Sequence, residues 1–114
     1  MPGDEDDEGD LGKLIMDLSA IGIPSTPNMF ALRVEGDSMI GAGINDGDVV
    51  LLEKREARTG EIVAALVDQH VTLKRLIIEG KKTLLRAENP KYADIHPVSE
   101  LEIQGVAVGL IRPL

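Results

Sequence analysis

The chain has 114 residues, a net charge of −8 and no cysteine. A chain of this length forms one domain around one core, and without cysteine it has neither disulfides nor a thiolate-ligated metal site. We expect no metal and no other cofactor, because its two histidines, His70 and His96, are not spaced as ligands. Only 2% of the residues are aromatic, so the core must be aliphatic and there is little to stack on nucleic-acid bases.

The negative charge is concentrated at the N-terminus. Six of the first ten residues are acidic and none is basic, so the other 104 residues carry a net charge of only −2. We expect residues 1–10 to be a disordered acidic tail, because they bury too little apolar surface to offset their ordering entropy. Residues 11–114 then form a single domain. Its basic residues are dispersed, so we expect no direct binding to DNA.

The sequence also lacks the marks of a membrane protein or an exported protein. No apolar run approaches the roughly 18 residues that a membrane-spanning helix needs. The N-terminus has no basic segment followed by an apolar one, which is the pattern of a signal peptide. We therefore expect a cytoplasmic chain with no membrane partner.

Beyond the tail, the sequence alternates between short apolar stretches and turns. Residues 11–23 fit a short helix, but residues 14–16 could equally be an edge strand, and prolines place a loop after this segment. Strand patterns then follow at residues 29–34, 49–53, 62–67, 71–78, 83–86 and 102–111, the last as one or two strands. Short strands with turns at roughly ten-residue spacing predict a mostly β, antiparallel fold, either a sandwich or a partly open barrel, with little helix.

Glycines and small polar residues mark the connections between these strands. After the first strand, Ser38 is predicted to begin a turn or a short helix, with Asp37 or Ser38 as its N-cap. Residues 68–70 predict a short hairpin loop, and residues 88–94 predict a longer loop. In the last strand, Gly105 and Gly109 are candidates for bulges or for the close approach of another segment.

Ser38 is a candidate nucleophile because it follows Gly36, where a strand gives way to a glycine-rich turn. A turn after a strand exposes the next side chain together with backbone N–H groups. The N–H groups of Ser38 and Met39 are therefore candidates for an oxyanion hole. On pattern alone, a turn or N-cap hydroxyl is the commoner role for such a serine.

Lys74 is the candidate base for Ser38. A serine hydroxyl needs a base at neutral pH, and lysine can act as one only when it is uncharged. Alternation along a strand puts Lys74 on the same face as Thr72 and Leu76, where burial lowers the pKa of an amine. The competing interpretation is a lysine at a sheet edge with its ammonium in water, which is common for long cationic side chains.

Several stretches of this sequence resemble the LexA family of self-cleaving repressors. The strongest likeness is in residues 30–40 (FALRVEGDSMI) and 43–49 (GINDGDV). Residues 60–68 (GEIVAALVD) and 71–75 (VTLKR) agree as well, and so do residues 87–90 (AENP) and 105–112 (GVAVGLIR). The resemblance covers about residues 28–112, in order and at family-like spacing.

This resemblance implies a β-rich peptidase domain in which Ser38 is the nucleophile and Lys74 the general base. In that family the substrate is an Ala-Gly bond in the protein's own N-terminal cleavage loop. A RecA–single-stranded-DNA filament favours the cleavable conformation. Cleavage separates a DNA-binding domain from the dimerising peptidase domain, and this derepresses the genes of the SOS response to DNA damage. The implied partners are thus a second copy of the chain and the RecA filament, in the bacterial cytoplasm.

The sequence departs from a complete repressor in two respects. It has no N-terminal helix-turn-helix, and its first 36 residues contain no Ala-Gly pair. We therefore expect a C-terminal fragment, either a cleavage product or a shortened chain. The alternatives are a processed UmuD-like polymerase accessory protein, a phage repressor fragment, or a module that only dimerises. A signal peptidase shares the serine–lysine chemistry, but this sequence shows no membrane anchor.

Overall fold

The computed structural model describes Gly22 and residues 27–97 and 101–114. The tail predicted at residues 1–10 and, apart from Gly22, the helix or edge strand predicted at residues 11–23 lie outside the described residues. The described elements are β1 (Met29–Arg33), the 3-10 helix η3 (Ile40–Ala42), β2 (Val49–Glu53), β3 (Ile62–Val67), β4 (His70–Glu79), β5 (Lys82–Arg86) and β6 (Glu102–Ile111). Each predicted strand is confirmed to within one residue at either end.

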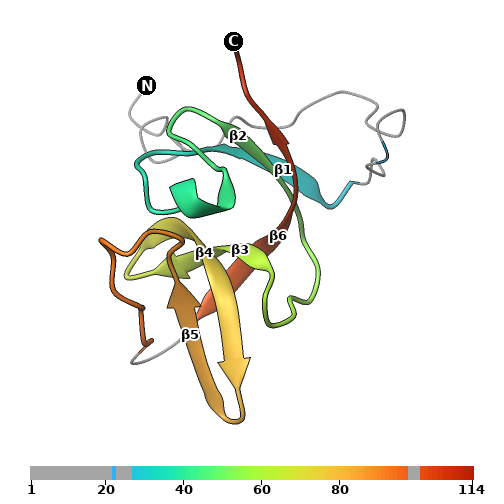
Figure 1. The fold of residues 1–114 in the computed structure, drawn as a ribbon. Coiled ribbons are helices and arrows are strands. Elements are labelled where there is room, and N and C mark those ends of the chain that lie inside the picture. The colour runs from blue at the N-terminus through green and yellow to red at the C-terminus, as the bar shows by residue number, and fades with distance from the viewer. Residues whose placement is uncertain (1–21, 23–26, 98–100) are drawn as a thin grey trace.

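The strands form one sheet in the order β1-β2-β6-β3-β4-β5, and every neighbouring pair is antiparallel. This confirms the mostly β, antiparallel fold with little helix. All the strands of the described residues belong to this one sheet, so they do not form the two separate sheets of a sandwich. The last strand in sequence, β6, lies in the middle of the sheet and joins a β1–β2 half to a β3–β4–β5 half (Figure 1).

Strand β6 bends the sheet between these halves. Its C-terminal part pairs with β2 and its N-terminal part pairs with β3, and each pairing contains a register shift. The residues skipped in the two registers, Val108 and Gln104, each precede a glycine, and such bulges bend a strand and increase its twist. Gly105 is a point of close approach as predicted, because a Cβ there would lie 2.8 Å from the Phe30 ring.

The core is aliphatic, as the scarcity of aromatic residues predicts. One cluster of buried side chains lies between the serine turn and the sheet, and a second lies among the strands of the β3–β4–β5 half and β6. The first consists of Met39, Ile44, Val50, Leu52 and Ala64, and the second of Val63, Ala65, Leu76, Leu85 and Val106. Met39 is only 2% exposed. Burying such a side chain contributes about 1.5–3 kcal/mol, so Met39 anchors the turn that carries Ser38.

The hairpin between β3 and β4 brings Lys74 back beside β3. Asp68 and Gln69 form its turn with φ values of 49° and 68°, the left-handed region that two-residue hairpin turns require. His70 belongs to β4 rather than to the loop, which corrects the predicted three-residue connection. The pairing places Lys74 directly opposite Val63.

Candidate active site

The serine turn begins where β1 ends. Val34 donates its N–H to Asp48 O at 2.8 Å, and Gly36 has a φ of 91°, in the left-handed region that favours glycine. The predicted N-cap was wrong, because Met39 occupies the N-cap position of η3 and no side chain caps the helix. The Asp37 carboxylate instead accepts hydrogen bonds from Lys91 Nζ and from the Tyr92 hydroxyl. Ser38 therefore does not use its hydroxyl to cap η3.

The Lys74 amine meets the Ser38 hydroxyl at the edge of β4. Lys74 Nζ lies 3.1 Å from Ser38 Oγ, 2.6 Å from Thr72 Oγ1 and 3.2 Å from the carbonyl oxygen of Leu73. The residue is only 7% exposed. Burial lowers the pKa of Lys74 below its ordinary value, and in the described part of the chain no carboxylate forms an ion pair with it.

An uncharged amine can also make these three contacts. A neutral lysine has two N–H groups and one lone pair, whereas an ammonium has three N–H groups and no lone pair. If Thr72 Oγ1 and the Leu73 carbonyl accept the two N–H groups, the lone pair is left for the hydroxyl proton of Ser38. Sequence alternation had put Thr72 on the lysine face, but it gave no sign of this direct contact.

The N–H groups predicted for an oxyanion hole are unoccupied within the described residues. Neither Ser38 nor Met39 donates its backbone N–H to an acceptor there, while the carbonyl oxygens of both residues accept hydrogen bonds. An N–H group without a protein acceptor is available to a developing negative charge. The structure thus brings Lys74 beside Ser38, and Met39 follows Ser38 directly in the sequence.

The loop after β5 holds the serine turn from outside, which sequence reasoning missed. Asn89 is 7% exposed, and its side chain donates to Asp37 O at 2.9 Å and accepts from the N–H of Lys91 at 3.0 Å. Gly41 donates to Glu88 O at 2.7 Å, and a Cβ on Gly41 would lie 2.5 Å from that oxygen. The available signal was a polar asparagine beside a proline, which by itself indicates only a loop.

The Ala-Gly pair absent from the first 36 residues does occur once, at Ala42-Gly43. It lies at the end of η3, where Ala42 donates its N–H to Met39 O and Gly43 donates to Ile40 O. These bonds make the pair part of the folded serine turn rather than of an extended linker.

The described residues meet neither the requirements of a metal site nor those of a membrane-spanning helix. Across residues 27–97 and 101–114, no group of three or more potential ligands is arranged to hold a metal ion. Both histidines are exposed. Among the described residues there is also no helix of the length and apolarity that crossing a bilayer requires.

A comparison with protein families gives the class of this protein. Residues 4–108 match the family described as Peptidase S24-like. The match spans most of the chain, so the chain belongs to the Peptidase S24-like family.

Individual relatives narrow this class to the LexA type. The LexA repressor of Verrucomicrobium spinosum is 52% identical over 102 residues, which cover 90% of this chain and 50% of that protein. The LexA repressor of Opitutus terrae is 57% identical over 84 residues, covering 73% of this chain and 42% of that protein. The LexA repressor of Leptospira interrogans is 49% identical over 85 residues. The chain spans about half the length of these curated relatives, and the resemblance to the LexA family is confirmed.

Proposed function

We propose that this chain is the self-cleaving domain of a LexA-type repressor, in which Ser38 is the nucleophile and Lys74 the general base. The observation that carries the proposal is the 3.1 Å contact between Lys74 Nζ and Ser38 Oγ. Burial without a counter-ion disfavours the ammonium form, which is what a base requires. We keep residues 11–114 as the proposed bounds of the peptidase domain, although the family match begins at residue 4.

The reaction needs only groups of this site, the substrate and a water molecule. Neutral Lys74 takes the hydroxyl proton while Ser38 Oγ attacks the scissile carbonyl. The N–H groups of Ser38 and Met39 stabilise the oxyanion, a contribution of about 3–4 kcal/mol per donor in comparable sites. The Lys74 ammonium then protonates the departing amine, leaving an acyl-enzyme. Lys74, neutral again, activates the water that releases the acyl group.

The free part of β4 is where the substrate peptide would lie. Strand β5 pairs with β4 only from Arg75 to Glu79, so β5 leaves the edge of residues 70–74 uncovered. Ser38 faces this edge through its contact with Lys74. An extended peptide added there would gain main-chain hydrogen bonds and pass the nucleophile.

The biological setting follows from the relatives and remains part of the proposal. The substrate is an Ala-Gly bond in the repressor's own N-terminal linker. A RecA–single-stranded-DNA filament stimulates the cut in the bacterial cytoplasm. Cleavage detaches the DNA-binding part from this domain, which pairs with a second copy of itself. Loss of that linkage lowers affinity for paired DNA half-sites, because the two binding events are no longer tethered, and the DNA-damage genes are derepressed.

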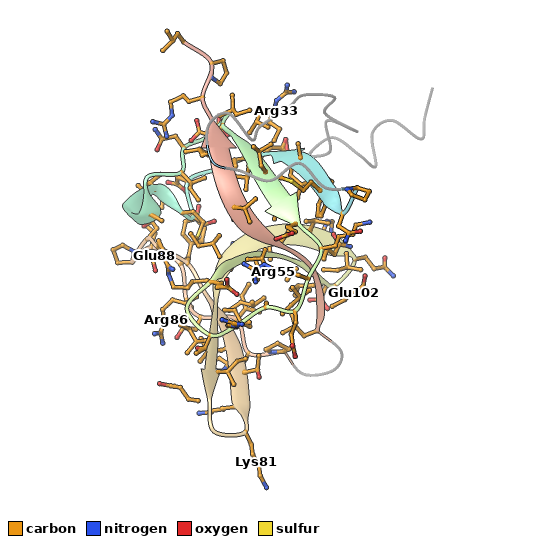
Figure 2. The ribbon with its side chains drawn as sticks, turned by 90° about the vertical axis from the view of Figure 1, so that its right-hand side faces the viewer. Arg33, Arg55, Lys81, Arg86, Glu88 and Glu102 are labelled. Carbon is orange, nitrogen blue, oxygen red and sulfur yellow. The ribbon has the colours of Figure 1, made fainter. Side chains whose placement is uncertain are left out.

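The test is cleavage of a peptide that carries the Ala-Gly site, supplied in trans at alkaline pH. We expect the wild-type chain to cleave it, and Ser38→Ala and Lys74→Ala to lose this activity. Lys81→Ala is the matched control, because Lys81 is exposed at the tip of the β4–β5 hairpin (Figure 2). Cleavage at the wild-type rate by either site variant would refute the proposed roles.

The pH dependence gives a second test of the base. If Lys74 must be neutral, the rate rises with pH through the lowered pKa of its amine and reaches a plateau below the ordinary lysine value. A flat profile between about pH 6 and 10 would contradict a role for Lys74 as base.

A further inference from the structure

Glu88 is bonded to the serine turn through its backbone. Its N–H donates to Ser38 O at 2.8 Å, and its carbonyl accepts the N–H of Gly41 at 2.7 Å. These bonds fix the turn on both sides of Met39, one at the nucleophile and one inside η3. Figure 2 shows Glu88 beside this short helix.

The side chain of the same residue is bonded to the lysine strand. Glu88 Oε2 accepts a hydrogen bond from Arg75 Nε at 3.1 Å. Arg75 follows Lys74 directly in β4, and its guanidinium also donates to Gly60 O. Glu88 thus connects the element that carries the nucleophile with the strand that carries the base.

The contact between Ser38 Oγ and Lys74 Nζ is sensitive to small displacements of the turn or of the strand. Ser38 and Lys74 are 36 positions apart in the sequence, and they lie on a turn and a strand that are not neighbours in the chain. Catalytic geometry tolerates little error, since a misplacement of about 1 Å costs roughly a hundredfold in rate. Asn89 reinforces the same connection through its bond to Asp37 O.

We propose that Glu88 is a positioning residue that sets the separation between the Ser38 hydroxyl and the Lys74 amine. The inference rests on the proposed function for its catalytic consequence, but the geometry that it describes is independent of any substrate. Glu88 does not touch the reacting atoms. It acts through the Arg75 side chain and through the backbone of the serine turn.

A second ion pair provides a matched control. Arg86 and Asp94 pair through two hydrogen bonds at the β5 edge, and Figure 2 shows Arg86 nearer to the hairpin tip than Glu88. The Glu88 and Asp94 side chains have the same exposed fraction, 29%. The Arg86–Asp94 pair is exposed and the Arg75–Glu88 pair is part-buried, with both its side chains still about 30% exposed. Ion pairs that water reaches contribute little to global stability, so neither Glu88→Gln nor Asp94→Asn should unfold the chain.

The experiment compares these two variants with the wild type by two measurements. The first is the rate at which a fluorophosphonate modifies Ser38. The second is the pKa of the Lys74 amine, measured by NMR titration, which needs no activity. We expect Glu88→Gln to slow modification by about tenfold to a hundredfold and to raise the Lys74 pKa towards its ordinary value, because the amine gains water. We expect Asp94→Asn to leave both unchanged.

The outcomes separate this inference from the proposed function. A Lys74 pKa and a Ser38 modification rate that are both unchanged in Glu88→Gln overturn the inference. So does a slower rate that accompanies a lower urea midpoint with an unchanged Lys74 pKa, since that describes a general loss of stability. If the wild type is not modified at Ser38, the proposed function fails, and the NMR titration still decides whether Glu88 positions the amine.

Discussion

Two buried charged residues of this protein, Lys74 and Asp48, have opposite surroundings. Asp48 is 1% exposed, and its carboxylate accepts hydrogen bonds from Arg112 Nε and an Arg112 terminal nitrogen, both at 2.8 Å, and from the Asn45 N–H at 2.7 Å. Lys74 is 7% exposed, and its amine contacts only uncharged oxygen atoms. The carboxylate of Asp48 has a charged partner inside the protein, whereas the amine of Lys74 has none among the described residues.

Both pKa values are lowered, but the consequence for the charge is opposite, because one group is an acid and the other is a base. The hydrogen bonds from Arg112 lower the pKa of Asp48 to about 2, which keeps this carboxylate charged. Burial lowers the pKa of Lys74, which favours loss of its charge. A buried carboxylate with a bidentate partner keeps its charge and joins distant parts of the fold. A buried amine without a charged partner loses its proton more easily, which is what the proposed role of Lys74 requires. The comparison gives four predictions.

The largest effect is expected from Lys74→Arg. The arginine side chain is about as long as that of lysine. Its guanidinium stays protonated at every relevant pH, so it cannot act as the base. We expect peptide cleavage to fall by about 10²–10⁴-fold, the usual contribution of a positioned base. The measurement is single-turnover cleavage at several pH values, with Lys82→Arg as the control at an exposed position. Activity within a few-fold of wild type would show that Lys74 does not need to lose a proton.

Asp48→Asn is expected to give the next largest effect, on stability rather than on chemistry. An amide cannot accept two hydrogen bonds from Arg112 as a carboxylate does, so the urea midpoint at pH 7 should fall. The folded-state pKa of Asp48 is lowered, so its contribution is present above the ordinary value near 3.8 and is lost as pH falls towards 2. Asp48→Asn should therefore lose less stability than wild type across this acid range.

The control for this substitution is Asp68→Asn, since Asp68 is exposed in the β3–β4 turn. Its urea midpoint should match that of the wild type at both pH 7 and pH 2.5. Equal acid sensitivity in Asp48→Asn and the wild type would show that the Arg112 pair does not govern stability in this pH range.

Thr72→Val is expected to have a moderate effect on rate. Valine has the shape of threonine but cannot accept the hydrogen bond that Lys74 Nζ donates at 2.6 Å. A hydrogen bond of this kind contributes about 1 kcal/mol, so cleavage should fall by roughly five- to tenfold. Thr72→Ser keeps the hydroxyl and should remain near the wild-type rate. Equal rates for Thr72→Val and Thr72→Ser would show that the hydroxyl does not orient the Lys74 amine.

The smallest effect is expected from Lys74→Met, as a change in stability. Because the folded-state pKa of Lys74 is lowered, the protonated amine destabilises the fold at neutral pH. This cost diminishes as pH rises towards the ordinary value near 10.5, since only the unfolded chain then keeps the proton. Lys74→Met should thus be more stable than wild type at pH 7, and the difference should shrink by pH 10. Urea unfolding measures it, and Lys81→Met should show no such trend.

The strands were predictable because each is a local pattern. Alternating and apolar stretches located all six to within a residue at each end, and the same alternation placed Lys74 beside Thr72 and Leu76 on one face. The N-cap was not predictable from local sequence, because Asp37 has a side chain suited to capping η3 but bonds Lys91 and Tyr92, more than fifty positions away. The linking role of Glu88 was hidden for the same reason.

The sequence by itself determined the strand pattern, the family and the two residues that stand out as a candidate nucleophile and base. Only the tertiary structure decided that Ser38 Oγ lies 3.1 Å from Lys74 Nζ. The physical reason is that this distance depends on non-local contacts. The sheet order leaves the edge of residues 70–74 free of β5, the burial of Met39 anchors the turn, and the loop after β5 holds that turn against β4. The lowered pKa of Lys74 likewise comes from the neighbours that fold around it.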